Sequence, residues 1–197
     1  MATDLANSPQ PMIATLVPEH GAARLASQIM LAVAGSIVLW VSAKTQVPFY
    51  PVPMTLQTLA LLVIAATYGF RLSMVTVLLY LAEGAFGLPV FSATPERGIG
   101  LLYMAGPTAG YLVGFVVATG LVGWFADRGA NRSSLRLFFV MLAAALSVLA
   151  IGGAYLSIIV GAQSAWTFGV MPFLLGDLVK VAIAALLVPA AAGLLRR

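Results

Sequence analysis

Apolar residues dominate six stretches of this chain, and short segments rich in glycine, proline or charge separate them. The first stretch, residues 25–43, contains no charged side chain. At 1.5 Å per residue, a helix of this length spans about 28 Å, which is close to the hydrocarbon thickness of a bilayer. The pattern therefore predicts a membrane-spanning helix over these residues.

Three prolines between positions 48 and 53 follow that helix and favour extended backbone, because proline fixes φ and lacks an N–H donor. The next helix can begin only after them, with Thr55 as its N-cap. We expect it over 55–68 and a third helix over 72–86, with the segment GFRLS between them. Both are shorter than a usual span, which indicates little tilt or loop residues that enter the membrane. The remaining apolar stretches predict helices over 103–126, 137–160 and 171–195.

Six spans place both termini on one side of the membrane, and the positive residues indicate which side. Lys44 and Arg97 fall in loops of the opposite side, and Lys180 falls inside a helix. An excess of Lys and Arg is typical of cytoplasmic segments, so we expect both termini in the cytoplasm. The arginines on the side of the termini are Arg24, Arg71, Arg128, Arg132, Arg136, Arg196 and Arg197.

The composition is that of an integral membrane protein, since 61% of the residues are hydrophobic and 8% are charged. We expect an all-α membrane domain of six helices over residues 25–197, preceded by a polar leader over residues 1–24. The first apolar run is longer than the core of a signal peptide and begins later, so we expect it to be retained.

No sequence motif points to catalysis. The chain has no cysteine and a single histidine, His20, so neither thiol chemistry nor a histidine metal site is expected. The patterns GxxxxGK[ST], HExxH and GxSxG are absent, so we expect neither ATP hydrolysis by this chain nor another enzymatic activity. The basic residues are scattered between apolar segments, which indicates membrane topology instead of nucleic-acid binding.

Three charged residues fall inside the predicted helices. Glu83 lies near the outer end of the third helix, and Asp177 and Lys180 lie in the outer half of the sixth. A charge at membrane depth is costly and by default marks a functional site. Asp177 and Lys180 are three positions apart, so both project from one helix face, which we expect to face the bundle interior. The alternatives are a mutually neutralising pair that only orders the helix, or an irregular break at GDLVK.

Aromatic and small residues form two further patterns. The expected outer loops, 44–54, 87–102 and 161–170, contain Phe49, Tyr50, Phe91, Tyr103, Trp166 and Phe168 or border on them, and an interfacial aromatic belt is the favoured interpretation. Small residues at every fourth position let helices approach closely, and such rows occur at Gly106, Gly110, Gly114 and Ala118. In the first helix the same spacing relates Ala32 to Ser36, or alternatively Ala22 to Ala26.

Four segments resemble the BioY family, and they occur in the family's order: VPFYPVPMTLQTL (47–59), YLAEGAFGLPVF (80–91), GPTAGYLVGF (106–115) and GDLVK (176–180). Members of this family are the substrate-binding S components of energy-coupling factor transporters for biotin. The resemblance extends from about residue 25 to the end of the chain. It implies a six-helix S-component bundle in the bacterial cytoplasmic membrane that captures biotin from the outer side.

The resemblance also implies partner proteins. In these transporters a transmembrane coupling protein and two ATPases supply the energy, which agrees with the missing ATP-binding loop in this chain. The coupling protein would dock on small residues of the first helix, here Ala32 and Ser36. Members of the family also act without these partners, and the chain would then be expected to form a homo-oligomer.

The chemistry of biotin suggests roles for the charged residues. The cyclic urea of biotin has two N–H donors and a carbonyl acceptor, so Asp177 can accept while Lys180 donates. The valerate carboxylate needs a cation, for which Arg97 is the candidate. Glu83 can hold Arg97 or accept the second urea N–H. In the alternative pose, Lys180 binds the carboxylate.

Two further residues, Gln57 and Tyr111, lie in the first and third of the four segments and complete the expected biotin site. No cofactor is expected besides the transported biotin. Three alternatives stand beside biotin uptake: an S component or solitary transporter for another small vitamin, a membrane scaffold without transport activity, and a membrane enzyme.

Overall fold

The computed structural model describes residues 12–15, 17–18, 20–47 and 52–195. Most of the predicted leader lies outside these ranges, as do Phe49, Tyr50, Arg196 and Arg197. Within the described ranges, five helical segments are long and apolar enough to cross a membrane. They are α1 (Gly21–Lys44), α2 (Gln57–Ala85), α4 (Ala109–Asp127), α5 (Ser134–Val160) and the span Ala162–Gly193, most of which belongs to α7 (Met171–Leu195).

Short elements connect these helices. The 3-10 helix η2 (Met12–Thr15) precedes α1, and the strands β1 (Gln46–Val47) and β2 (Met54–Thr55) form an antiparallel pair between α1 and α2. The one-turn helix α3 (Gly100–Met104) precedes α4, and the 3-10 helix η3 (Ala130–Arg132) connects α4 to α5. The chain passes from α5 to α7 through α6 (Ala162–Ser164) and the π-helix η4 (Ala165–Val170).

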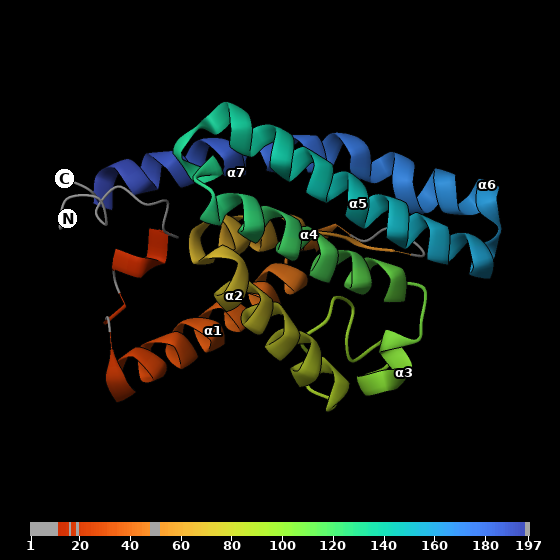
Figure 1. The fold of residues 1–197 in the computed structure, drawn as a ribbon. Coiled ribbons are helices and arrows are strands. Elements are labelled where there is room, and N and C mark those ends of the chain that lie inside the picture. Colours follow the sequence, from red (N-terminus) through yellow and green to blue (C-terminus); the bar gives the residue numbers. More distant parts are fainter. Residues whose placement is uncertain (1–11, 16, 19, 48–51, 196–197) are drawn as a thin grey trace.

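The second and third predicted helices correspond to the two arms of one element, α2, so the five long helical segments of the described structure contain the six predicted helices. Gly69 divides α2 with a non-helical backbone, φ 74° and ψ −179°, into an arm over 57–68 and an arm over 70–85. Glycine adopts this conformation at little cost because it has no Cβ. Figure 1 shows the two arms of α2 meeting in a sharp bend. The predicted separator GFRLS is thus reduced to a single residue.

The end of α4 supports this bend. The carboxylate of Asp127 accepts the backbone N–H of Phe70 at 3.1 Å, so a side chain from another helix caps the second arm of α2. A Cβ at Gly123 would lie 2.7 Å from the Cα of Phe70, which shows how closely the two backbones approach. The bend therefore depends on the sequence of α4 as well as on Gly69.

The prediction of a loop over 161–170 is wrong, because nearly all of this segment is helical. Gly161 ends α5 with a positive φ of 82°, and the chain is helical again from Ala162. Pro172 lacks the N–H that would bond to the carbonyl four residues earlier, and the wider π turn just before it accommodates that loss. Asp177 consequently lies near the middle of a helical span of 32 residues.

Three other predicted boundaries shift. α1 begins at Gly21, inside the predicted leader. The predicted helix over 103–126 is divided, since Tyr103 belongs to α3 and a turn containing Gly106 and Pro107 separates α3 from α4. α5 begins three residues early because Ser133 caps it, with its hydroxyl accepting the N–H of Arg136 at 3.4 Å.

The helices run back and forth between two ends of the molecule (Figure 1). The start of α1, the bend of α2, the α4–α5 connection and the end of α7 lie at one end, and the strands, α3 and α6 lie toward the other. The arginines of the first end that the structure describes are exposed: Arg24, Arg71, Arg128, Arg132 and Arg136. This arrangement is the one expected for termini on a common, arginine-rich side.

The interior lies around α4, which packs between α2 and α5, while α7 packs on α5 and α2. α1 packs mainly on α2, and most of its surface is exposed. The predicted close packing of the glycine row is confirmed: a Cβ at Gly110 would lie 2.9 Å from the carbonyl oxygen of Ile151, and one at Gly114 would lie 2.8 Å from the Cα of Val148. α4 and α5 are therefore in backbone contact along this row.

Candidate functional site

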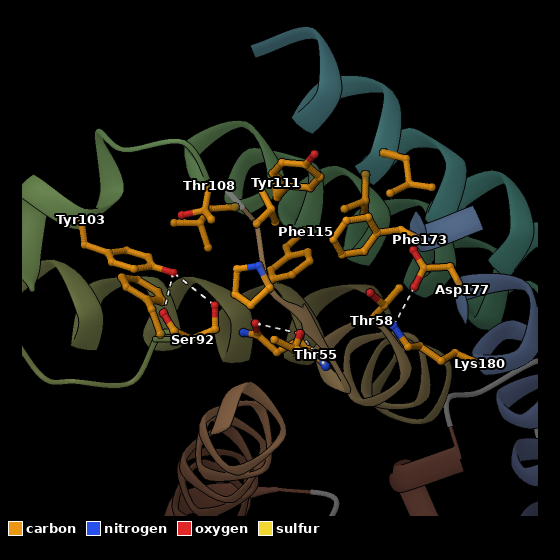
Figure 2. Close-up of a pocket in the computed structure, with 17 residues that line it drawn as sticks. Thr55, Thr58, Ser92, Tyr103, Thr108, Tyr111, Phe115, Phe173, Asp177 and Lys180 are labelled. Atoms are coloured by element: carbon orange, nitrogen blue, oxygen red, sulfur yellow. Dashed lines mark hydrogen bonds and ion pairs between the residues drawn. The ribbon is translucent and has the colours of Figure 1, made fainter. Parts of the chain in front are cut away.

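A pocket of about 530 Å³, partly open to the outside, lies between α2, α4, α5, α7 and the segments that precede α2 and α4 (Figure 2). Its wall comes from segments far apart in the sequence: Val52, Pro53, Thr55, Gln57, Thr58, Phe91, Ser92, Tyr103, Thr108, Tyr111, Leu112, Phe115, Val148, Leu149, Phe173, Asp177 and Lys180.

One end of the pocket is charged. Lys180 Nζ donates to Asp177 Oδ1 at 2.8 Å, and the two residues are 8% and 4% exposed. The three-residue spacing on α7 brings both side chains to the same face, as predicted, and that face points into the bundle (Figure 2). Of the described residues that line the pocket, these two alone carry charges, and they neutralise each other.

The opposite end of the pocket carries hydroxyl groups. The hydroxyl of Tyr103 donates to the carbonyl oxygen of Ser92 at 2.8 Å and lies 3.2 Å from the hydroxyl of the same serine. Thr108, just before α4, also lines the pocket. This end therefore offers polar groups without a charge.

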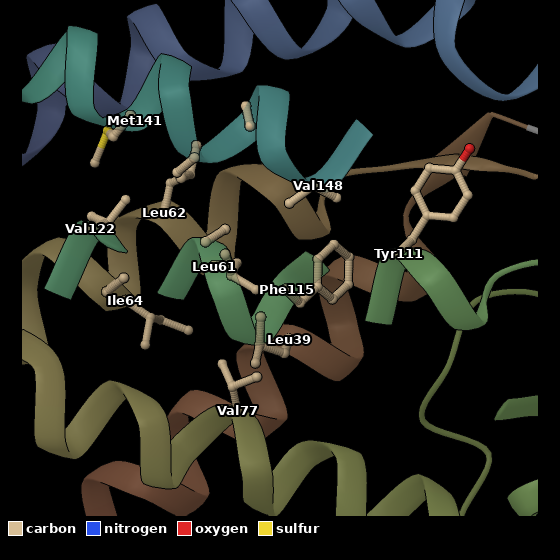
Figure 3. Packing of buried hydrophobic residues seen from close by; sticks show 14 of the residues in the cluster. Leu39, Leu61, Leu62, Ile64, Val77, Tyr111, Phe115, Val122, Met141 and Val148 are labelled. Atoms are coloured by element: carbon tan, nitrogen blue, oxygen red, sulfur yellow. The ribbon is translucent and has the colours of Figure 1, made fainter. Parts of the chain in front are cut away.

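Apolar and aromatic side chains form the wall between the two ends. Phe115 and Phe173 lie there with Tyr111, whose ring centroid is 6.4 Å from that of Phe173. Figure 3 shows Phe115 and Val148 near Tyr111, and these residues belong to the main hydrophobic core. The pocket is thus a cavity at the edge of the core, with polar groups at both of its ends.

Tyr111 contributes its ring to the pocket, while its hydroxyl donates to the carbonyl oxygen of Gly169 in η4 at 2.7 Å. Two glycines make room for this side chain. A Cβ at Gly152 would lie 2.3 Å from the ring, and a Cβ at Gly169 would lie 2.7 Å from the hydroxyl. The predicted site residue Tyr111 therefore lies in the pocket wall, with its donor already bonded.

Gln57, the other predicted site residue on a motif, also lines the pocket and is 5% exposed. Its Nε2 donates to the hydroxyl of Tyr80 at 2.7 Å, and its Oε1 accepts the hydroxyl of Thr55 at 3.2 Å. Thr55 also accepts the backbone N–H of Gln57, but it is not the predicted N-cap, because Leu56 occupies that position. These contacts fix the amide of Gln57 at the wall.

The predicted residues Glu83 and Arg97 do not line the pocket. Glu83 lies at the contact between α2 and α1, where its Oε1 accepts the hydroxyl of Ser36 at 3.0 Å. Arg97 is exposed in the loop over residues 86–99, which connects α2 to α3. The structure therefore brings together four of the six predicted ligand-binding residues: Gln57, Tyr111, Asp177 and Lys180.

The predicted docking residues Ala32 and Ser36 are buried, with 4% and 1% exposure, on the face of α1 that packs on α2. The alternative pair, Ala22 and Ala26, is exposed. In this structure a partner approaching α1 from outside would thus meet the alternative pair and the large apolar residues beside it, such as Met30.

The interfacial-belt interpretation is wrong for two of the aromatic residues. Phe91 and Tyr103 are 1% and 7% exposed, and their rings stack with centroids 5.0 Å apart. Trp166 and Phe168 are about half exposed, as a belt requires. Sequence reasoning missed Phe91 and Tyr103 as pocket residues, and the available signal was that Phe91 closes the segment YLAEGAFGLPVF, which carries the family resemblance.

Comparison with protein families gives one match, the BioY family, over residues 12–197. Similar proteins include the probable biotin transporter BioY of Pyrococcus horikoshii, 33% identical over 147 residues that cover 75% of this chain and 85% of the relative. The biotin transporter BioY of Rhizobium etli is 36% identical over 71% of this chain and 77% of its own length. The biotin transporter BioY of Thermotoga maritima is 33% identical over 75% of this chain and 85% of its own length.

Among solved structures, the S-component for biotin from an ECF-type ABC transporter superimposes with a TM-score of 0.77. The match covers 87% of this chain and 94% of the other, at 18% sequence identity. The chain therefore has the S-component fold and is a multi-pass membrane protein.

Proposed function

Because the chain belongs to the BioY family, we propose that it takes up biotin across the cell membrane and acts as the substrate-binding S component of an energy-coupling factor transporter. The relatives are named as transporters, so the activity is transport and not catalysis. The observation that carries the proposal is the buried pair Asp177 and Lys180 in the wall of this pocket.

The polar ends of the pocket suit the two polar parts of biotin. Asp177 can accept an N–H of the cyclic urea and Lys180 can donate to its carbonyl, so the ligand would replace the contact that the two side chains now make with each other. The apolar wall of Phe115 and Phe173 suits the sulfur-containing ring and the aliphatic chain. The carboxylate would then lie toward Ser92 and the loop that carries Arg97.

The reverse pose, with the carboxylate on Lys180, is the competing arrangement. Lys180 is the sole cationic side chain among the described wall residues, whereas Arg97 lies outside the wall. The two poses differ in their response to a ligand that lacks the carboxylate charge. If Lys180 binds the urea, replacing biotin by its primary amide leaves the effect of Lys180→Ala unchanged, and it removes the effect of Arg97→Ala.

Biotin binding to the purified chain tests the proposal. We expect one biotin per chain, and we expect both Asp177→Asn and Lys180→Ala to weaken binding by about a hundredfold, because each leaves a buried partner unpaired. Ser157→Ala serves as a control, since its exposed hydroxyl bonds only to the carbonyl oxygen of Ala154 on its own helix. Unchanged affinity in both site variants would contradict the site, and stronger binding of thiamine or another vitamin would contradict the substrate.

We also propose a transmembrane coupling protein and two ATPase subunits as partners. The chain has no ATP-binding loop of its own, and the S-component fold supports this assignment. Co-purification with a tagged coupling protein tests it. If the chain accumulates biotin in cells that lack such partners and purifies as a homo-oligomer, it acts alone and this part of the proposal fails.

A further inference from the structure

We propose that Lys44 and Tyr80 anchor the loop over residues 86–99 from two sides and thereby set how long a ligand stays in the pocket. Both are positioning residues, because the loop supplies Phe91 and Ser92 to the pocket wall while neither anchor lines the pocket itself. The statement about ligand retention rests on the proposed function. The anchoring itself can be tested without a ligand.

Lys44 is the last residue of α1, and it binds the loop with its ammonium group. Its Nζ donates to the carbonyl oxygens of Phe91 at 3.0 Å and Thr94 at 2.7 Å, and to the hydroxyl of Thr94 at 3.0 Å. All three acceptors are neutral and belong to one short segment of the loop. Lys44, which was predicted to lie in an outer loop, therefore holds the loop over residues 86–99 against the end of α1.

Tyr80 binds the same loop from α2. Its hydroxyl donates to the carbonyl oxygen of Val90 at 2.9 Å and accepts from Gln57 Nε2 at 2.7 Å. Tyr80 has no exposed surface, so loss of the hydroxyl would leave Val90 and Gln57 without this partner in a dry environment. The same hydroxyl thus links the loop to a residue of the pocket wall.

Between these two anchors, Phe91 is inserted into the helix packing. Its ring meets the ring of Tyr80 edge to face, with centroids 5.4 Å apart, and stacks on Tyr103. A Cβ at Gly84 would lie 2.1 Å from the Phe91 ring, so the helix opposite has no side chain where the ring sits. The loop contains no helix or strand in the described structure. These side-chain contacts hold it in place, together with the bond from Tyr103 to Ser92 and the backbone bond from Leu88 to Glu83.

Hydrogen exchange of the loop amides and biotin dissociation rates test the proposal. We expect Lys44→Met and Tyr80→Phe each to raise exchange across residues 88–98 about tenfold, and to speed biotin dissociation to a similar extent. Arg136→Met removes an equal charge at the other end of the molecule, and Tyr68→Phe removes a hydroxyl bonded to the carbonyl oxygen of Leu31. Both controls should leave exchange in the loop and biotin dissociation as in the wild type.

A double-mutant cycle separates anchoring from general destabilisation. Thr94→Val removes one of the three acceptors of Lys44 and also the bond from the Thr94 hydroxyl to the carbonyl oxygen of Phe91 at 2.6 Å. The part of its effect on loop exchange that depends on Lys44 should be absent in the Lys44→Met background. Wild-type exchange in the loop of both anchor variants, or additive effects in the cycle, would overturn the proposal. Failure of the wild type to bind biotin would refute the proposed function instead, while loop exchange would still decide whether the anchors exist.

Discussion

Asp177 and Lys180 illustrate how a buried pair combines a cost in stability with a role in recognition. Removing two charges from water is expensive, and the mutual attraction of the ions offsets only part of that cost. Each of the two residues is at least nine-tenths buried, so neither charge has an alternative partner in water. The cost of burying such a pair is explained if a ligand binds to the same two side chains.

Substituting the pair tests this interpretation. We expect either single change, Asp177→Leu or Lys180→Leu, to lower the free energy of unfolding by about 3–5 kcal/mol, because an uncompensated charge remains. The double change should be close to the wild type in stability and should fail to bind biotin. Thermal unfolding in detergent together with biotin binding measures both effects. A double variant as unstable as the single ones would show that the pair is needed for packing.

Gly84 is a second position of interest, because a single added carbon atom there would overlap the ring of Phe91. We expect Gly84→Ala to lower the thermal unfolding temperature by several degrees and to weaken biotin binding, because the new Cβ would occupy the place of the Phe91 ring. Gly193→Ala is the matched control, since no heavy atom lies within 4 Å of a Cβ there. Equal behaviour of the two variants would contradict the described packing of Phe91.

At the scale of elements, α2 is defined by its bend. A helix that turns back within the bundle exposes backbone groups at the turn, and those groups need partners in a low-dielectric environment. Gly69 adopts the non-helical backbone of the turn, and Asp127 accepts a backbone N–H there. Gly123 has no side chain and so leaves room for the Phe70 backbone. α2 and α4 therefore specify the bend jointly.

Two glycines of α4 provide a matched pair of substitutions. Gly123→Ala should destabilise the protein by about 1–3 kcal/mol, because its Cβ would overlap the Phe70 backbone. Gly120→Ala should be tolerated, since its nearest neighbour is a side-chain atom of Phe70 at 3.6 Å. Unfolding of both variants in urea or by heat gives the comparison. If Gly120→Ala were the more harmful change, the contact between α4 and the bend would be incorrectly described.

At the scale of the whole molecule, the arginines and the helix order give the same topology. The exposed arginines lie at the end where α1 starts and α7 ends, and Gln163 in α6 is exposed toward the other end. A membrane with cytoplasmic arginines thus has the pocket-lining segments before α2 and α4 in its outer half.

Cysteine labelling tests this orientation directly, because the natural chain contains no cysteine. We expect a membrane-impermeant thiol reagent to label Gln163→Cys in intact cells. Leu135→Cys, at the exposed start of α5, should be labelled only after the cells are opened. The reverse result would invert the topology.

The sequence alone was sufficient for features set by hydrophobic length, by charge and by spacing along one helix. The long helices, the side of the arginines and the common face of Asp177 and Lys180 are of this kind. Contacts between distant segments could not be predicted from the sequence. Nothing local shows that Lys44 reaches a loop 47 residues later, or that Glu83 faces Ser36 and not the pocket.

The break between the second and third helices was predicted from the sequence, but the helical continuity between α5 and α7 was not. Glycine and proline usually end helices, and Gly69 does separate the two arms of α2, whereas Pro172 lies in the first turn of α7, directly after the π-helix η4. At Gly69 a neighbouring helix supplies the cap, because Asp127 of α4 accepts the N–H of Phe70.

The mutual neutralisation of Asp177 and Lys180 has an electrical consequence. The described wall of the empty pocket carries no net charge, so returning the empty site to the outside does no work against the membrane potential. Biotin with its ionised carboxylate adds one negative charge. Carrying that charge inward through the full potential costs about 2.3 kcal/mol per 100 mV when the interior is negative. The membrane voltage would therefore oppose only the step in which the loaded site moves inward.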